Sequence, residues 1–311
     1  MFSLVIPVYR NEGSIPDLVA ALSDLNRQMG GDLEAVLVVD GSPDRSLALL
    51  REELPKAGFR SQLLALSRNF GSFAAIRAGL AAARGDLFAV MAADLQEPPE
   101  LILEFRQQLE TGDYDIAVGS RTARADSWTT RVSSALFWSL YRRLAQPEMI
   151  SGGVDVFGGT REVRNQLVNL RESNSTLVGL LFWIGYRRCE VPYERRERQH
   201  GKSAWTLWRK IRYLLDSLFA FTILPVRLLT FLGLAGLGVS VLLGTIVITA
   251  KLMGNIEVPG YTATVLTVMF FGGLNSAGLG LIGEYLWRTF ENTKERPNYI
   301  VAKTYEFETQ E

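Results

Sequence analysis

Residues 33–44 read LEAVLVVDGSPD, an apolar run that ends in an acidic residue and a Gly-Ser-Pro turn. A run of this kind, rich in Val and Leu, is typical of a strand that is buried on both faces of a sheet. Similar runs occupy residues 2–9 (FSLVIPVY) and 86–93 (DLFAVMAA), with shorter ones at 62–67 and 115–119. The sequence therefore predicts a sheet that contains these strands.

Helices are predicted between the strands, at Ile15–Met29, Asp44–Leu54, Ser72–Ala83 and Pro98–Leu109. Strands that alternate with helices of this length predict an α/β domain with a mainly parallel sheet, covered by helices on both faces. Ligands bind at the carboxyl ends of the strands in such sheets. Polar clusters stand at these ends, at residues 9–12, 40–44, 67–71 and 94–98.

The composition excludes several classes of function. Basic and acidic residues both number 33, so the net charge predicts no nucleic-acid partner. The single Cys189 excludes an internal disulfide framework, and the single His200 disfavours a histidine metal site or a Ser-His-Asp triad. The first apolar run is cut off by Pro7 and is too short for a signal peptide, so we expect the N-terminal part in the cytoplasm.

Two later stretches, Leu228–Ala250 and Thr262–Gly283, carry no charged residue. A helix needs about 20 apolar residues to cross a bilayer, so both are predicted to be transmembrane helices, with buried core helices as the alternative. Basic residues flank the pair on both outer sides, whereas the loop at 251–261 carries one basic and one acidic residue. The positive-inside rule then predicts a multi-pass protein of the cell membrane, with its soluble domain in the cytoplasm.

Between the two regions lies Trp205–Leu224, with its basic residues near the start and interfacial Trp and Tyr side chains. This pattern favours an amphipathic helix on the membrane surface, and a core helix of the soluble domain is the alternative. The predicted division is a soluble domain at 1–204, a surface helix at 205–225, two membrane spans within 226–287 and a cytoplasmic tail at 288–311.

Six motifs occur in one order along nearly the whole chain: SLVIPVYRNE (3–12), VDGSPD (39–44), SRNFG (67–71), ADLQEPP (93–99), GSR (119–121) and GEYLWRTFENTKERPNY (283–299). Together they resemble the polyisoprenyl-phosphate glycosyltransferases of glycosyltransferase family 2, which are related to dolichyl-phosphate mannose synthase. The resemblance is closer to the bacterial enzymes that make glucosyl-undecaprenyl phosphate for O-antigen modification. It implies a GT-A type fold.

The resemblance implies that a nucleotide-sugar binds along the first strands, at Pro7, Tyr9, Glu12, Asp40 and Ser67. A carboxylate at the end of a strand can accept hydrogen bonds from a base or ribose, which suits Asp40. Its alternative role is a turn or helix cap. Tyr9 would stack on the base and Glu12 would bind the ribose or a basic neighbour. A turn that enters a helix also explains Ser67.

Asp94 and Gln96 are the predicted metal ligands, and Asp94 is also predicted to bind the nucleotide-sugar and to take part in catalysis. A diphosphate leaving group needs its charge neutralised, and Mg²⁺ or Mn²⁺ does this with oxygen ligands. The family usually has Asp-x-Asp-x-Gln here, but Ala92 replaces the first Asp in this chain. A turn before a helix that starts with proline is the alternative interpretation.

Asp155 matches the Asp of the family's G-D-F-R segment, which implies a general base that faces the acceptor. A phosphate monoester has a second pKa of about 6, so a lipid phosphate is already largely dianionic at neutral pH. Asp155 is therefore expected to orient the acceptor more than to remove a proton. A surface turn is the alternative.

Two phosphate-bearing substrates require cations, and Arg suits bidentate contact with phosphate. By resemblance, Arg121 and Arg131 lie near the acceptor phosphate, and Arg198 and Lys202 lie in a mobile loop that closes over the diphosphate. The same run also contains Arg195 and Arg196. Attraction to anionic lipid is a compatible alternative for the run.

These features predict inverting transfer of a sugar from a nucleotide-sugar to polyprenyl (undecaprenyl) phosphate, for modification of lipopolysaccharide or cell-wall glycan. The resemblance favours UDP-glucose. A processive polysaccharide synthase would carry a Q-x-x-R-W motif, but Gln199 is followed by His200-Gly201-Lys202. A non-catalytic membrane scaffold stays open because of Ala92. Gly-rich spans allow close helix packing within or between chains, which leaves a homo-oligomer open.

Overall fold

The computed structural model describes residues 1–121, 139, 141–143, 147–150, 153–170, 172, 175–196, 215–253 and 260–308. The chain divides into two compact units. The first comprises Met1–Tyr213 and Arg296–Glu311, and the second comprises Leu214–Glu295.

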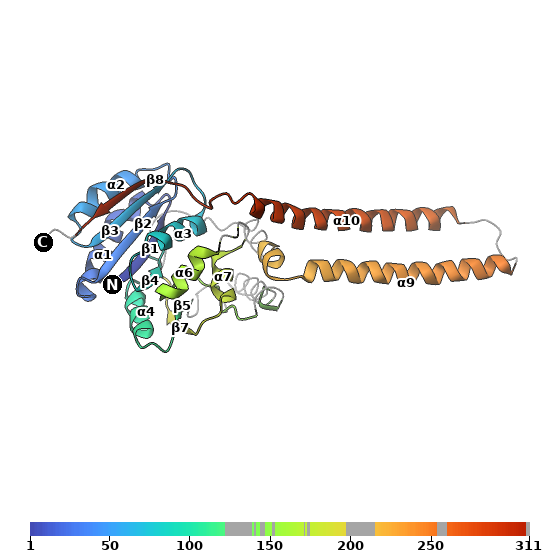
Figure 1. Ribbon diagram of the computed structural model, residues 1–311, viewed down its shortest axis with the longest axis horizontal. Coiled ribbons are helices and arrows are strands. Elements are labelled where there is room, and N and C mark those ends of the chain that lie inside the picture. The colour runs from blue at the N-terminus through green and yellow to red at the C-terminus, as the bar shows by residue number, and fades with distance from the viewer. Residues whose placement is uncertain are drawn as a thin grey trace. The chain divides into compact units, whose positions relative to one another are not determined.

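The first unit is built on an eight-stranded sheet with the order β7-β5-β6-β4-β1-β2-β3-β8 (Figure 1). Strands β6 and β8 run antiparallel to their neighbours, and the remaining pairs are parallel. The expected α/β class and mainly parallel sheet are therefore confirmed, with two reversed strands added. The strands are β1 (Phe2–Val8), β2 (Leu33–Val39), β3 (Arg60–Leu66), β4 (Leu87–Val90), β5 (Ile116–Arg121), β6 (Phe157–Thr160), β7 (Arg188–Tyr193) and β8 (Val301–Phe307).

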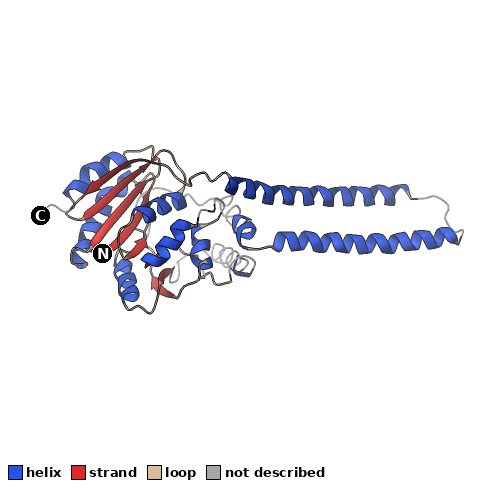
Figure 2. Cartoon of the chain, viewed as in Figure 1, coloured by secondary structure: helices blue, strands red, loops and turns tan. Residues whose placement is uncertain are grey.

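Helices cover both faces of this sheet (Figure 2). Leu4 and Ile6 of β1 belong to the core shared with α1, α2 and α4, whereas Val5 points to the other face, beneath α3. Both faces are buried, which explains the unbroken apolar runs of β1 and β2. The helices are α1 (Ile15–Gln28), α2 (Ser46–Glu53), α3 (Ser72–Ala82), α4 (Glu100–Glu110), α6 (Arg161–Asn169) and α7 (Leu177–Trp183), with 3₁₀ turns at Glu12–Ser14 and Leu54–Lys56.

The C-terminal residues differ from the predicted tail at 288–311. Strand β8 pairs antiparallel with β3, and Ser67 N donates to Ile300 O at 2.9 Å. Tyr305 and Phe307 pack against the core, and the Arg51 guanidinium lies 4.8 Å from the centre of the Tyr305 ring. The alternating pattern of VAKTYEF allows one side of the strand to pack while the other stays solvated. The end of the chain therefore completes the sheet of the first unit.

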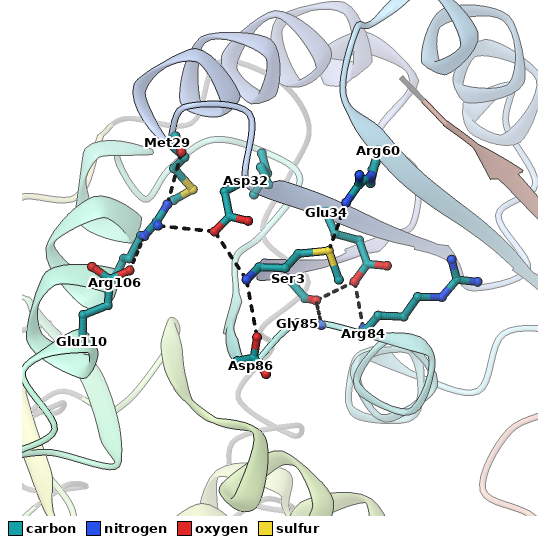
Figure 3. Close-up of polar contacts among 12 residues, drawn as sticks. Ser3, Met29, Asp32, Glu34, Arg60, Arg84, Gly85, Asp86, Arg106 and Glu110 are labelled. Carbon is teal, nitrogen blue, oxygen red and sulfur yellow. Dashed lines mark hydrogen bonds and ion pairs between the residues drawn. The ribbon is translucent and has the colours of Figure 1, made fainter. Parts of the chain in front are cut away.

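A buried carboxylate joins the strands at the edge of the sheet where β1, β2 and β4 begin. Glu34 accepts hydrogen bonds from Ser3 Oγ (2.5 Å) and Arg84 N (2.8 Å) (Figure 3). Its other oxygen accepts from Gln62 Nε2 at 2.8 Å. Gly85 N in turn donates to Ser3 Oγ at 2.7 Å. Both oxygens of Glu34 are satisfied, as a buried charged group requires, and the cluster is structural.

The second unit contains α9 (Leu224–Leu252) and α10 (Tyr261–Thr293), which include the two predicted spans. Within the described residues, one helix is long and apolar enough to cross a membrane, Leu224–Ala250, with a mean hydropathy of 2.3. The hydroxyl of Thr245 donates to Val241 O at 2.8 Å, and Thr249 does the same to Thr245 O. Such bonds satisfy polar side chains inside an apolar helix. The second span stays a prediction.

The predicted surface helix is described only in its last part, because residues 205–214 lie outside the described residues. Residues 215–221 are helical and belong to the second unit. Arg288 of α10 donates to Asp216 at 2.8 Å, and its guanidinium lies 5.0 Å from the centre of the Phe219 ring. This part of the segment therefore packs on α10 within the second unit.

The close approach of α3 to β1 depends on Gly79. A Cβ at this position would lie 2.3 Å from Val5 Cγ1 and 3.1 Å from Val38 Cγ2. We predict that Gly79→Ala lowers the free energy of unfolding by about 1–2 kcal/mol, since overpacking exceeds the gain in helix propensity. Ala81→Ser on the exposed side of the same helix also adds one heavy atom and should change it by less than about 0.5 kcal/mol. Equal melting temperatures for the two variants would contradict this packing.

Candidate active site

The polar clusters predicted at the strand ends lie at one edge of the sheet. The ends of β1, β2 and β3 form one half of this edge, and the ends of β4, β5 and β7 form the other. Because β6 is antiparallel, its beginning, just after Asp155, lies at this edge as well. Ser14 Oγ donates to Ala93 O at 3.1 Å and so connects the loop after β1 with the loop after β4.

Asp40 locks the loop after β2 to the loop after β3. Its side chain is 2% exposed and accepts hydrogen bonds from the backbone N–H groups of Phe70 (2.7 Å) and Gly71 (2.8 Å). Gly41 has a φ of +57°, and a Cβ there would lie 2.3 Å from the carbonyl carbon of Arg68. These contacts give Asp40 a structural role between two loops, whereas the helix caps next to these loops are Arg45 and Gly71. A contact with a nucleotide stays a prediction and would have to share these oxygens.

The other predicted donor residues occupy the same half of the edge. Glu12 Oε2 accepts from Arg45 N at 3.0 Å, which ties the loop after β1 to the start of α2. Tyr9 is 41% exposed, and the Arg10 guanidinium lies 5.4 Å from the centre of its ring. Pro7 lies in β1 opposite Val38. Ser67 directly follows β3 and donates its N–H to Ile300 O of the C-terminal segment.

Asp44 supports the same loops. Burial raises the pKa of this carboxyl, but hydrogen bonds from Ser42, Ser46 and the backbone of Glu12 outweigh the effect and lower the pKa overall. Ser42 Oγ donates to Asp44 Oδ1 at 2.6 Å, and Glu12 N donates to Asp44 Oδ2 at 3.1 Å. The carboxylate thus holds three segments of the donor half together.

The loop after β4 carries the predicted metal ligands. Gln96 N donates to Asp94 Oδ1 at 3.4 Å, and Leu95 has a φ of +54°. Gln96 Oε1 accepts from Arg195 Nη2 at 2.5 Å, and Gln96 O accepts from Arg196 N at 2.9 Å. The oxygen expected to bind a metal is therefore engaged by an arginine that follows β7.

Arg195 also reaches the predicted acceptor side. Asp155 forms an ion pair with Arg121, the last residue of β5, and lies 3.7 Å from Arg195 Nη1. Of the predicted residues, Asp94, Gln96, Arg121 and Asp155 are thus collected in one place around Arg195. Arg131, Arg198 and Lys202 lie outside the described residues.

Glu97 also belongs to this site, although the sequence did not predict a role for it. It is 1% exposed, and its Oε1 lies 3.9 Å from Arg195 Nε. Burial raises the pKa of Glu97, and the neighbouring Asp94 raises it further, while Arg195 and Arg121 oppose the shift. The only hint in the sequence is an acidic residue between Gln96 and two prolines, which also suits the start of a helix.

Tyr193 lies at the end of β7, next to this group. Its side chain is buried, and burial is the main cause of its raised pKa, to which the Glu97 carboxylate adds, while Arg121 and Arg195 oppose the shift. Among the described residues, no group of three or more His, Cys, Asp or Glu side chains is placed to hold a metal ion. The charged groups here are arranged mainly as pairs with arginine.

Known proteins of similar sequence are glycosyltransferases by name. The model of the family described as Glycosyl transferase family 2 matches residues 3–168. A bactoprenol glucosyl transferase of Shigella phage SfII is 30% identical over 304 residues, covering 97% of this chain and 98% of the relative. An undecaprenyl-phosphate 4-deoxy-4-formamido-L-arabinose transferase of Edwardsiella ictaluri is 33% identical, covering 96% of this chain and 92% of the relative.

Among solved structures, the glucosyl-3-phosphoglycerate synthase of Mycobacterium tuberculosis, in complex with Mn²⁺, UDP-glucose and phosphoglyceric acid, is 17% identical with a TM-score of 0.49. The match covers 71% of this chain and 79% of that chain. The resemblance inferred from the six motifs is confirmed by the family match and the full-length relatives. The α/β fold with a mixed sheet agrees with the expected GT-A type.

The role of Asp40 as a backbone acceptor gives a direct test. In Asp40→Asn, the new amide group cannot accept both N–H groups of Phe70 and Gly71, so one buried donor loses its partner. We expect the free energy of unfolding to fall by about 1–3 kcal/mol. Asp113→Asn, at an exposed position, is the matched control and should leave the melting temperature unchanged. A melting temperature of Asp40→Asn equal to that of the control would exclude this role.

Proposed function

Because the chain belongs to glycosyl transferase family 2, and is therefore a glycosyltransferase, we propose that it transfers a sugar from a nucleotide-sugar to undecaprenyl phosphate. One observation carries the proposal: the ion pairs of Asp155 with Arg121 and Arg195 lie beside the Asp94 loop, at the strand ends. Such an arrangement combines cations for phosphate groups with carboxylates that orient the reactants.

The donor half of the edge is proposed to bind the nucleotide. Tyr9 is exposed enough to stack on a base, and Pro7 and Ser67 border the same loops. Asp40 and Glu12 would contact the base and ribose with the hydrogen-bonding capacity that their backbone contacts leave. UDP-glucose is the proposed donor, because relatives named glucosyl transferases match the chain over nearly its whole length.

A divalent cation, Mg²⁺ or Mn²⁺, is proposed to accompany the donor. Ala92 removes one carboxylate, and Gln96 is bonded to Arg195, so Asp94 remains as the protein ligand. One carboxylate with diphosphate oxygens and water fits Mg²⁺, which often binds in this way. When bound, the ion would neutralise charge on the leaving diphosphate.

The proposed chemistry is a single displacement with inversion. An oxygen of the lipid phosphate attacks the anomeric carbon, the new carbon–oxygen bond forms, and the bond to the nucleoside diphosphate breaks with its electron pair. Arg121 would bind the acceptor phosphate, together with Arg131, while Arg198 and Lys202 would close over the diphosphate. Asp155 would orient the phosphate, which needs no proton removed at neutral pH.

The reaction is proposed to occur at the cytoplasmic face of the cell membrane. Helix α9 has the length and composition of a span, and Thr262–Gly283 of α10 is the proposed second span. The basic flanks of this pair favour a cytoplasmic catalytic domain. The product, a lipid-linked sugar, would serve reactions that modify envelope glycans.

A donor panel tests the proposal. Purified protein in detergent is mixed with undecaprenyl phosphate, Mg²⁺ or Mn²⁺, and one labelled nucleotide-sugar at a time. We expect label in the lipid extract, most with UDP-glucose, and inverted anomeric configuration by NMR. Asp94→Asn should lower the rate by about 100-fold or more, as expected for loss of an electrostatic contribution to the transition state. Folded protein that transfers no sugar from any donor would favour the non-catalytic scaffold.

Ala92→Asp tests the proposed metal site separately. The substitution restores a second carboxylate, so the concentration of Mn²⁺ that gives half the maximal rate should fall at least about tenfold, or about 1.4 kcal/mol in binding. EDTA should abolish turnover of both proteins. Ala93→Ser, a change at the next residue that adds no charge, is the control. A metal requirement that is unchanged in Ala92→Asp would place the ion elsewhere.

A further inference from the structure

We propose that Glu97 and Arg195 form a buried positioning pair that sets the distance between the donor loop and Asp155. The inference rests on the proposed function, because it assigns a role within the same site. Arg195 is the positioning residue that contacts both sides, and Glu97 holds Arg195 in place. Neither residue is expected to contact the reacting atoms.

The nitrogens of Arg195 point to three residues from two other parts of the chain. Nη2 donates to Gln96 Oε1 at 2.5 Å, Nη1 lies 3.7 Å from Asp155 Oδ2, and Nε lies 3.9 Å from Glu97 Oε1. Gln96 and Glu97 follow β4, whereas Asp155 precedes β6. A planar guanidinium can make these contacts at fixed angles, and an ammonium group cannot. Arg195 therefore joins the donor side of the site to the acceptor side.

Glu97 is unusual among the buried carboxylates of the first unit. Its side chain is 1% exposed, and its Oε2 has no hydrogen-bond partner among the described residues. Glu34, at the opposite edge of the sheet, is buried as well but has both oxygens bonded. Burying a carboxylate without full hydrogen bonding costs stability. A purely structural role explains Glu34 but leaves the position of Glu97 unexplained.

The surroundings of Glu97 indicate what it acts on. Arg195 Nε is also buried, and no described residue forms a hydrogen bond with it; it faces Glu97 across the 3.9 Å contact. The backbone of Arg196 holds Gln96 from the same side, through Arg196 N and Gln96 O at 2.9 Å. Three contacts thus join the segment after β7 to the loop after β4, and the Glu97–Arg195 pair is the one that involves a fully buried carboxylate. Loss of the pair should loosen the donor loop and misalign Asp155 together.

The adjacent pair provides a matched control. Arg196 Nη2 lies 3.1 Å from Glu100 Oε2, and both side chains are more than half exposed. Glu100 is three residues beyond Glu97 and pairs with the arginine next to Arg195. An exposed pair of this kind contributes little to stability. Glu100→Gln therefore makes the same chemical change as Glu97→Gln, outside the proposed pair.

The test uses the full-length chain in detergent, with Glu97→Gln, Arg195→Lys, the double variant and Glu100→Gln. Two quantities are measured besides the melting temperature: the Kd for UDP in the presence of Mn²⁺, and kcat for sugar transfer at saturating substrates. We expect Glu97→Gln and Arg195→Lys each to raise the Kd about fivefold to tenfold and to lower kcat about 100-fold. Glu100→Gln should stay within about twofold of the unchanged protein.

Two further comparisons separate positioning from stability. The double variant should have the same Kd and kcat as either single variant, because each single substitution already breaks the Glu97–Arg195 pair. In an Asp155→Asn background, Arg195→Lys should lower kcat much less than it does alone, because Arg195 acts through Asp155. The melting temperatures of the single variants should stay within a few degrees of the unchanged protein.

The outcomes are distinct. Kd and kcat values of Glu97→Gln equal to those of Glu100→Gln would overturn the inference. A loss of kcat or UDP binding that is fully accounted for by a smaller fraction of folded protein would overturn it as well. If no donor supports transfer but Glu97→Gln still weakens UDP binding relative to Glu100→Gln, the proposed function fails and the positioning pair stands. If transfer and this difference in UDP binding are both absent, both proposals are wrong.

Discussion

The site depends on one reversal in the sheet. Strand β6 runs antiparallel between β4 and β5, so Asp155, two residues before its start, lies at the edge where the parallel strands end. Had β6 run parallel, its beginning would lie at the opposite edge of the sheet. The close pairing of β6 with β4 requires glycine, because a Cβ at Gly158 would lie 2.6 Å from Phe88 O. The position of the Asp155 carboxylate thus depends on the pairing of β6 with β4.

The strands β1 to β5 and the helices α1 to α4 could be predicted because their side-chain patterns are determined locally. Val and Leu runs reflect burial on both faces, and turn residues mark their ends. Strand β6 reads FGGT and has no such pattern. Gly158 is required by the close approach of β4, which is not visible in the sequence of β6 itself. Strand β8 lies at an edge with mostly exposed residues, so its pairing with β3 is decided by a partner far away in the sequence.

The candidate site was predictable to the extent that its residues belong to motifs. Asp94, Gln96, Arg121 and Asp155 come together as the order of strands requires. The motifs could not reveal which hydrogen bonds these side chains form within the protein. Both carboxylate oxygens of Asp40 accept hydrogen bonds from backbone N–H groups. The side-chain oxygen of Gln96 accepts a hydrogen bond from Arg195, which is distant in the sequence. Glu97 has no local pattern that reveals its burial, because the groups that interact with it, on Arg195, Arg121 and Tyr193, come from distant parts of the chain.

Strand β8 also has a consequence for synthesis of the protein. The chain leaves the first unit, passes through α9 and α10, and only then supplies the last strand of the sheet. During translation, β3 therefore exposes an unpaired edge until residues 301–307 have left the ribosome, by which time both long helices have already been made. Unpaired edges invite association with other chains. The sheet of the first unit is thus completed only after the second unit has been synthesised, so the order of the chain delays the final strand pairing of the catalytic domain.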